Sequence, residues 1–255
     1  MFRSGKKDKP QRLLAMTKTK TAITATPSSP KSCPSNPWTG ITWADTVASC
    51  DKGIITSAYC SAKGIDIDCL PEPFSGNIDS PVVCLNGNPG PADKCFHGDP
   101  TFEKLTINTL KHSKTGGRLW DTPLEKSGKL HDGYLWFQER TKELRSAICP
   151  KDLNLFMLEF FPYHTVKSFN FPSLPSDEYR NYLLCQAMKE GKLIVMLRGR
   201  SRWFAIKDTC CDGEKIGEKL SNYPNLIFHR NPRSVYISER NFEPSDWEKL
   251  VNALK

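Results

Sequence analysis

The chain has 255 residues and a formal net charge of +8, and 38% of its residues are hydrophobic. A chain of this size and composition can bury the core of one or two domains. It has no run of the roughly 18 apolar residues that a membrane-spanning helix needs, so we expect no membrane association. Eight basic residues and one acid in residues 1–35 account for +7 of the charge, which leaves about +1 for residues 36–255.

Residues 1–38 are rich in Lys, Thr, Ser and Pro and should form a disordered basic arm, followed by a single globular domain over residues 39–255. A basic arm can add non-specific affinity for phosphates, although a solvated tail is the simpler interpretation. The longest apolar run of this segment, Leu13–Met16, is too short for the core of a signal peptide. A transit peptide remains an alternative.

The ten cysteines include no C-x-x-C pair, so we expect no metal site, no iron–sulfur cluster and no other cofactor. Cys84 and Cys185 lie inside apolar stretches, where buried free thiols are the simplest interpretation. Because no secretory signal is recognisable, we expect a protein of the reducing cytoplasm. We also expect it to be monomeric.

Four short apolar runs predict β-strands that are buried on both faces of a parallel sheet, because each run is continuous and does not alternate with polar residues. These runs are Pro81–Leu85, Leu153–Phe161, Lys192–Leu197 and Asn225–Phe228. Their spacing leaves room for helices between them. The sequence therefore predicts an α/β fold, a three-layer sandwich in which a central, mainly parallel four-stranded sheet is flanked by helices.

Three segments have the spacing of helices, namely Gly133–Ala147, Ser176–Glu190 and Ser245–Leu254. Ser176 is placed to cap the second of them, and Gly191 to end it. The third begins with S-D-W-E, which predicts a capping box at Ser245.

Polar residues follow each predicted strand, in the segments Asn86–Pro91, Pro162–Thr165, Arg198–Trp203 and His229–Ser234. The carboxyl ends of parallel strands meet at one edge of a sheet, and open α/β sheets bind their ligands there. We therefore expect these four loops to converge on one cleft.

The first loop reads Gly87-Asn88-Pro89-Gly90-Pro91, in which the amide of Asn88 can hold a water molecule. The last loop contains His229, followed by Pro232, Arg233 and Ser234. An imidazole here could donate a hydrogen bond to a carbonyl oxygen as negative charge builds on it. Taken alone, each motif is better explained as an ordinary turn, the second one with a surface His beside a proline.

Together and in this order, the two loops resemble motifs of the uracil-DNA glycosylase superfamily. The first is similar to the G-x-N-P-G-P water-activating motif of single-strand-selective monofunctional uracil-DNA glycosylases. The last is similar to the superfamily's H-P-S-P-R loop, although Arg230 and Asn231 stand where Pro and Ser are usual. Segments Leu70–Asn77, Pro162–His164 and Arg198–Trp203 resemble uncharacterised bacterial members. The resemblance covers roughly residues 68–240.

The resemblance implies that Asn88 positions the attacking water and that His229 stabilises the departing base. The base would contact the first loop and residues near it. The substrate-binding residues implied in this way are Gly87, Pro89, Gly90, Phe96, Phe102, Tyr163 and His164, with Phe102 or else Phe96 stacking on the flipped base.

DNA contacts are implied for the last two loops. Arg198, Arg200 and Arg202 could contact phosphates, and a solvated charged loop is the equal alternative. Trp203 could stack on a neighbouring base or anchor its loop. Arg233, with Asn231 and Ser234, would lie in the loop that props the bases apart.

Two departures bear on the substrate. Uracil readers of the superfamily have an Asn at the end of the second strand, whereas this chain continues Phe160 to His164 without one. Gly90 stands where strict uracil enzymes have a Tyr that blocks the C5 position. Both favour a C5-modified pyrimidine, such as a hypermodified phage cytosine excised in antiphage defence, over uracil or hydroxymethyluracil in base-excision repair.

The sequence thus predicts a monofunctional DNA glycosylase that leaves an abasic site, because the first motif lacks the Lys or Asp of a lyase. The alternatives are a non-catalytic nucleic-acid-binding protein on the same fold and a nucleotide or nucleoside hydrolase. The latter would be expected to have a glycine-rich phosphate loop that opens a helix.

Overall fold

The computed structural model describes residues 33–114, 117, 119–148, 153–166, 169–210, 212–231, 233–234 and 236–255. The chain divides into residues 1–31, which lie outside the described residues, and a second unit over residues 32–255. The predicted arm reaches into this second unit, because Trp38 is buried in its core. The Asn36 amide donates a hydrogen bond of 2.7 Å to the Leu110 carbonyl, so ordered chain precedes the predicted boundary.

A five-stranded sheet forms the centre of this unit, in the order β2-β6-β3-β8-β9. Its strands are β2 (Phe74–Gly76), β3 (Val82–Asn86), β6 (Phe156–Glu159), β8 (Leu193–Met196) and β9 (Leu226–Phe228). The last four run parallel, which confirms the four predicted strands. β3, β6 and β8 are buried along their whole length, which is why their sequences are almost unbroken apolar runs. β9, at the edge of the sheet, is half-buried at Leu226 and Phe228.

The predicted strand count is wrong, because β2 adds a fifth strand antiparallel to β6 and makes the sheet mixed. This edge strand has only three residues and no apolar run. Gly76 ends it with φ +82°, and a Cβ there would lie 2.0 Å from the Leu155 carbonyl oxygen. Glycine is therefore required at this position, since its backbone passes so close to β6.

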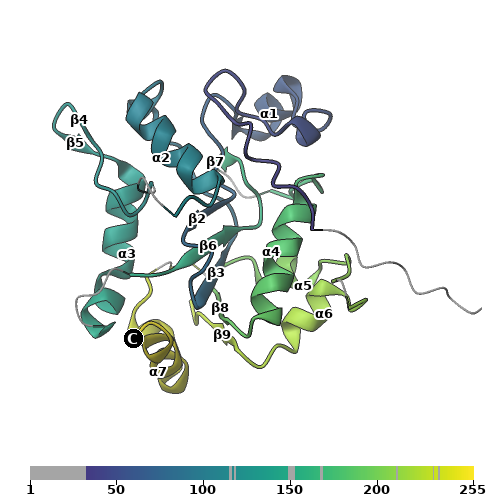
Figure 1. Ribbon diagram of the computed structural model, residues 1–255, viewed down its shortest axis with the longest axis vertical. Helices are drawn as coiled ribbons and strands as arrows, with labels where there is room; N and C mark the ends of the chain where they lie inside the picture. The colour runs from purple at the N-terminus through teal and green to yellow at the C-terminus, as the bar shows by residue number, and fades with distance from the viewer. Residues whose placement is uncertain are drawn as a thin grey trace, which may run out of the picture. The chain divides into compact units, whose positions relative to one another are not determined.

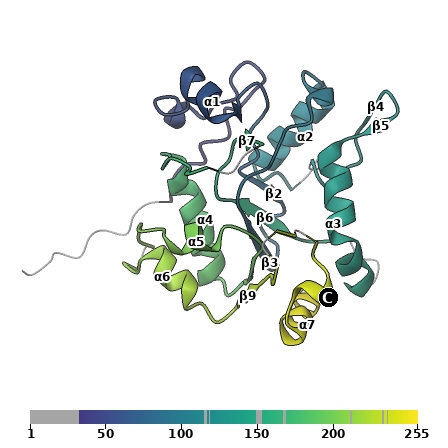
Figure 2. The same ribbon diagram turned by 180° about the vertical axis from the view of Figure 1, so that it is seen from behind.

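Helices lie on both sides of the sheet in both views (Figures 1 and 2). On one side are α2 (Pro100–Leu110) and α3 (Asp132–Ile148), and on the other are α4 (Asp177–Lys189), α5 (Arg200–Phe204) and α6 (Ile216–Ser221). Helix α7 (Pro244–Ala253) packs beside α3. The α/β prediction with flanking helices is therefore confirmed.

Smaller elements complete the unit. Helix α1 (Ser57–Lys63) precedes β1 (Ile65–Asp66), which pairs antiparallel with β7 (His164–Thr165). A hairpin of β4 (Glu125–Lys126) and β5 (Lys129–Leu130) leads into α3. Short 3₁₀ helices are η1 (Ser49–Asp51), η2 (Lys94–Phe96) and η3 (Glu239–Asn241).

The three predicted helices are confirmed, but two predicted caps are wrong. Ser176 precedes α4, yet its hydroxyl donates to the Asp51 carboxylate and caps nothing. Helix α7 begins at Pro244, one residue before the predicted capping box, and Glu243 occupies its N-cap without a side-chain hydrogen bond. Proline is well suited to the first helical position, where no amide hydrogen is needed. Gly191, with φ +73°, does end α4.

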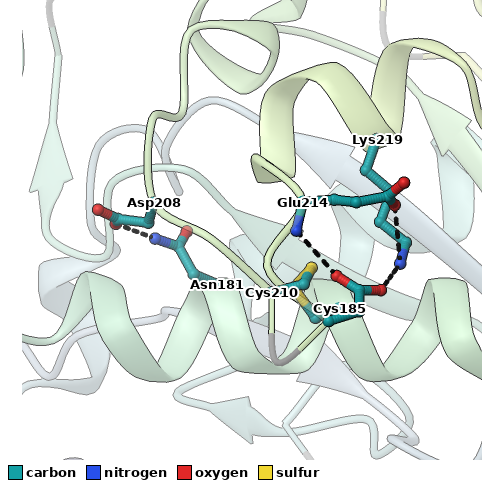
Figure 3. Close-up of a disulfide and its surroundings, with 7 residues drawn as sticks. Asn181, Cys185, Asp208, Cys210, Glu214 and Lys219 are labelled. Carbon is teal, nitrogen blue, oxygen red and sulfur yellow. Dashed lines mark hydrogen bonds and ion pairs between the residues drawn. A yellow bond between two sulfur atoms is a disulfide. The ribbon is translucent and has the colours of Figure 1, made fainter. Parts of the chain in front are cut away.

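One cysteine prediction is also wrong. Cys84 is a buried free thiol as predicted, but Cys185 forms a disulfide with Cys210. Figure 3 shows this bond joining α4 to the segment before α6, near a hydrogen bond of 2.7 Å from Asn181 to Asp208. The two cysteines are 25 residues apart, so only the packing of that segment on α4 brings them together.

Among the described helices, none is both long and apolar enough to cross a membrane.

Candidate functional site

A cavity of about 350 Å³ lies where β3, β6 and β8 end. One part of its wall comes from the loop after β3, from the ends of β6 and β8 and from β7, and another from α3 and the segment before it. The lining residues are Glu72, Asn86, Asn88, Pro89, Gly90, Pro91, Ala92, Asp93, Trp120, His131, Asp132, Gly133, Trp136, Glu159, His164 and Arg198. Three of the four predicted loops thus contribute to one cleft, whereas no described residue after β9 lines it.

Asn88 reaches this cavity from a loop that the neighbouring backbone holds in place. Its Nδ2 donates to the Thr165 carbonyl over 3.2 Å. The Gly87 and Gly90 carbonyls accept hydrogen bonds from the amides of Phe161 and Thr165, at 2.9 Å and 3.1 Å. With its nitrogen occupied in this way, the Asn88 side chain retains its oxygen as an acceptor for a ligand or a water molecule.

Asn86 and Glu159 form a buried pair at the carboxyl ends of β3 and β6, where they stand opposite each other in register. Each is 5% exposed. Asn86 Nδ2 donates to Glu159 Oε1 over 3.0 Å, and neither Asn86 Oδ1 nor Glu159 Oε2 has a partner. Burial raises the pKa of Glu159 to about 8, and the negative charge of Glu72 acts in the same direction. Glu159 is therefore neutral at pH 7, with its proton on Oε2 because Oε1 accepts from Asn86.

The Asn86 hydrogen bond and the Arg198 charge oppose this rise in the Glu159 pKa. Burial in turn lowers the pKa of Arg198, while Glu159 raises it. The two groups therefore act on each other across the cavity, although desolvation prevails on both.

Two tryptophans supply an aromatic part of the wall. Trp120 and Trp136 meet edge to face with ring centroids 5.3 Å apart. Trp120 is buried and its Nε1 has no hydrogen-bond partner, whereas Trp136 is half-buried. Burial lowers the pKa of neighbouring His131, which favours its neutral form. Flat apolar rings beside unpaired polar atoms suit a planar ligand with a polar edge.

His164 lines the cavity with both ring nitrogens on backbone carbonyls. Nδ1 lies 3.1 Å from the Gly90 oxygen and Nε2 lies 3.1 Å from the Leu70 oxygen. The Glu72 carboxylate lies 3.8 Å from Nε2.

His229 is not among the residues that line this cavity. Its Nε2 donates to the Tyr236 carbonyl over 2.9 Å, and its Nδ1 accepts from the Asn231 amide over 3.2 Å. The ring is buried and lies edge to face with Phe242. The His229 side chain is thus occupied by its own loop, so the predicted pairing of His229 with Asn88 at one cavity is not observed.

Three of the predicted substrate contacts, Phe96, Phe102 and Tyr163, are core residues outside the cavity lining, so the structure does not bring them to this cavity. Phe96 and Phe102 pack against each other and against His131. The Tyr163 hydroxyl donates to Asp51 over 2.8 Å and accepts from the Ala48 amide. Such large apolar rings close to a motif fit a core as well as a pocket, and the sequence does not distinguish the two.

Trp203 is fully buried and donates from Nε1 to the Asn86 carbonyl over 2.9 Å. It therefore anchors its loop, and its buried ring offers no exposed face for a base in this structure. Two predicted phosphate ligands also pack on rings, because Arg200 and Arg202 each lie 4.4 Å from a ring centroid, those of Phe228 and Phe171.

Arg198 does reach the cavity, and its guanidinium donates to the Arg233 carbonyl over 3.3 Å. Arg233 and Asn231 are exposed in a turn in which the Asn231 side chain accepts from the Arg233 amide over 3.0 Å. The Ser234 hydroxyl accepts from the Tyr236 amide in the same loop. Pro232 lies outside the described residues. DNA contacts by these residues stay a prediction.

Sequence reasoning missed much of the cavity wall, above all Glu72, Asn86, Trp120, Trp136 and Glu159. A signal existed for Glu159, because it is the one acid inside the apolar run Leu153–Phe161, and a buried acid commonly marks a functional site. Trp120 and Trp136 carried no such signal, since they reach the cavity only through the packing of α3.

No protein-family model, curated protein or solved structure matches the chain. Within the described residues, no group of three or more His, Cys, Asp or Glu side chains is arranged to hold a metal ion. The fold and the cavity define an α/β protein with a polar, aromatic-walled pocket at the carboxyl edge of its sheet.

Proposed function

We propose that the chain is a monofunctional DNA glycosylase that flips a damaged or C5-modified pyrimidine into the cavity and hydrolyses its N-glycosidic bond. The observation that carries this proposal is the position of Asn88 in the same cavity as two tryptophans and the buried Asn86–Glu159 pair. A volume of about 350 Å³ falls within the size range of small-molecule sites.

Asn88 would hold the attacking water through its side-chain oxygen, since its nitrogen is bonded to Thr165. Glycosidic cleavage passes through an oxocarbenium-like state, so a placed water and charge stabilisation count for more than a strong nucleophile. Arg198, a cation that lines the same cavity, would stabilise the base as it leaves with negative charge. His229 could act only after its Nε2 hydrogen leaves the Tyr236 carbonyl.

The surroundings of Gly90 favour a base with a C5 substituent. A Cβ built at Gly90 meets no atom within 4 Å, so the cavity is open at this point. A backbone with φ +82° also disfavours any side chain there. Excision of a hypermodified phage cytosine in antiphage defence is the proposal that this space supports, with uracil or hydroxymethyluracil repair as the alternative.

The test is an alkali-cleavage assay on DNA that contains uracil, hydroxymethyluracil, hydroxymethylcytosine or glucosylated hydroxymethylcytosine. We expect abasic sites in at least one DNA with a modified pyrimidine. Asn88→Ala should lower that rate by about 100-fold, the size of effect seen when a charge-stabilising or water-placing group is removed, while DNA binding persists. Asn252→Ala, on the exposed face of α7, is the matched control and should leave the rate unchanged. A wild-type protein that leaves every DNA intact would overturn the proposal.

A nucleoside hydrolase is the second candidate, and the charges at the cavity favour it. Glu72, Asp93 and Asp132 line the cavity and would repel a phosphate backbone, whereas a nucleoside carries no charge. Release of free base from nucleosides, without abasic sites in any DNA, would select this candidate over the glycosylase.

A further inference from the structure

The cavity contains polar atoms that no protein group satisfies. Six buried side-chain nitrogen or oxygen atoms lack a partner in the described part of the chain, and three of them belong to lining residues. These three are Asn86 Oδ1, Glu159 Oε2 and Trp120 Nε1. Because buried polar atoms are nearly always hydrogen-bonded, three orphans around one space indicate a polar ligand that completes them.

The Asn86–Glu159 pair offers a defined pattern to such a ligand. The bond from Asn86 Nδ2 to Glu159 Oε1 fixes the orientation of the amide, which leaves Oδ1 as an acceptor. Neutral Glu159 leaves Oε2–H as a donor. The backbone beneath is rigid, since the Asn86 carbonyl accepts from Trp203 Nε1 and from the Phe160 amide. A ligand edge that complements the pair must therefore place a donor next to an acceptor.

We propose that Asn86 and Glu159 together read the hydrogen-bonding edge of a pyrimidine, with Asn86 Oδ1 accepting from the base and Glu159 Oε2–H donating to it. This inference rests on the proposed function for the identity of the ligand as a base. The cytosine edge supplies N4–H and N3, and the uracil edge supplies N3–H and O4, so both present the required adjacent donor and acceptor.

The protonation state of Glu159 decides whether such an edge fits at all. An ionised Glu159 would leave two adjacent acceptors, and neither the N3–N4 edge of neutral cytosine nor the N3–O4 edge of neutral uracil has two adjacent donor groups. The pKa of about 8 keeps the neutral form dominant at pH 7. Other titratable or charged groups that line the same cavity are Glu72, Asp93, His131, Asp132, His164 and Arg198.

The first test compares pH profiles of Glu159→Gln and the wild type, because Gln keeps one acceptor and one donor at every pH. On a DNA that is cleaved, wild-type excision should fall roughly tenfold per unit above about pH 8, in proportion to the neutral fraction of Glu159. Whatever its rate at pH 7, the Glu159→Gln variant should show no such fall above pH 8. An identical fall in both proteins would overturn the inference, and their melting temperatures verify that both are folded.

The second test measures binding of free bases by calorimetry and needs no excision. Cytosine, uracil and their 5-hydroxymethyl derivatives distinguish the two sources of the edge. At least one of them should bind, and its donor-blocked form, N4,N4-dimethylcytosine or 3-methyluracil, should bind at least about tenfold more weakly, as expected when a buried acceptor is left unpaired. Equal binding of the blocked and unblocked bases would overturn edge reading even if excision is observed. Binding without excision from any DNA would instead overturn the proposed function and retain the edge reading.

Discussion

Glu159 is a carboxyl group that the fold keeps out of water with a single hydrogen bond. Its pKa is about 8 in the folded chain, against a usual value of 4.5. Between these two values the unfolded chain has lost the proton that the folded chain retains. Folding stability therefore declines as the pH rises from about 4.5 to about 8 and is constant, as far as this group is concerned, outside that window.

Replacing Glu159 by Gln should remove this decline. We expect Glu159→Gln to be more stable than the wild type at pH 9 by a few kcal/mol, on the order that a shift of this size implies, and to gain nothing at pH 4. Urea unfolding at both pH values measures the difference. The exposed Glu248→Gln serves as control and should change neither value. Equal gains at both pH values would contradict the assigned cause.

Tyr163 illustrates a residue whose role is structural although it lies close to the cavity in sequence. Its hydroxyl donates to Asp51, which also accepts from the Ser176 hydroxyl and amide. Tyr163→Phe should lower the free energy of unfolding by about 1–3 kcal/mol, because Asp51 is completely buried and loses one donor. The excision rate should stay within about twofold of wild type, since no contact to the ligand is removed. A large drop in the excision rate at an unchanged free energy of unfolding would mean that Tyr163 contacts the ligand after all.

At the scale of elements, the Cys185–Cys210 disulfide joins α4 to the segment that leads into α6 (Figure 3). The two cysteines are 25 residues apart in the sequence. A disulfide that closes a loop of this length restricts the unfolded chain and typically adds about 2–4 kcal/mol to the free energy of unfolding. Reductant, or the Cys185→Ser substitution, should therefore lower the midpoint of urea unfolding. Cys50→Ser changes an exposed free cysteine and is the matched control. A midpoint that is insensitive to reductant would mean that the bond does not form in solution.

Four of the five strands of the central sheet could be predicted from the sequence, and one could not. The strands β3, β6 and β8 were predictable because burial along their whole length gives each a continuous apolar run. β9 has such a run too, although only Ile227 of its three residues is fully buried. The edge strand β2 could not be predicted, because it pairs with β6 through its backbone. Its three residues, Phe74 to Gly76, are too few to show an apolar or alternating pattern.

The candidate site was predictable only in part, for a similar reason. Loops that follow parallel strands meet at one edge, which placed Asn88, His164 and Arg198 on the cavity. The loop after β9 follows the same rule, but its His229 turns into hydrogen bonds within that loop. Trp120 and Trp136 line the cavity only because α3 packs beside the sheet. A packing arrangement of this kind leaves no local pattern in the sequence.

At the scale of the whole molecule, charge is separated between the two units. Residues 1–31 include eight basic residues and one acid, whereas the rest of the chain is nearly neutral. If the protein works on DNA, deleting residues 1–31 should weaken non-specific binding and flatten its dependence on salt concentration, because fewer phosphate counterions are released. Excision from a short oligonucleotide at saturating enzyme should change little. Fluorescence anisotropy over a salt series measures the slope, and an unchanged slope would contradict a role for the basic segment in binding.

Asn86 takes part in three different contacts, with β6 through its side chain and with Trp203 and Phe160 through its carbonyl. Because Asn86 serves both the cavity and the sheet, few substitutions are tolerated there. Replacing Asn86 or Glu159 to change the ligand preference would also lower the free energy of unfolding. Ala92 and Trp136 also line the cavity and are only half-buried, so directed evolution toward other ligands should accumulate its first accepted changes at these two positions.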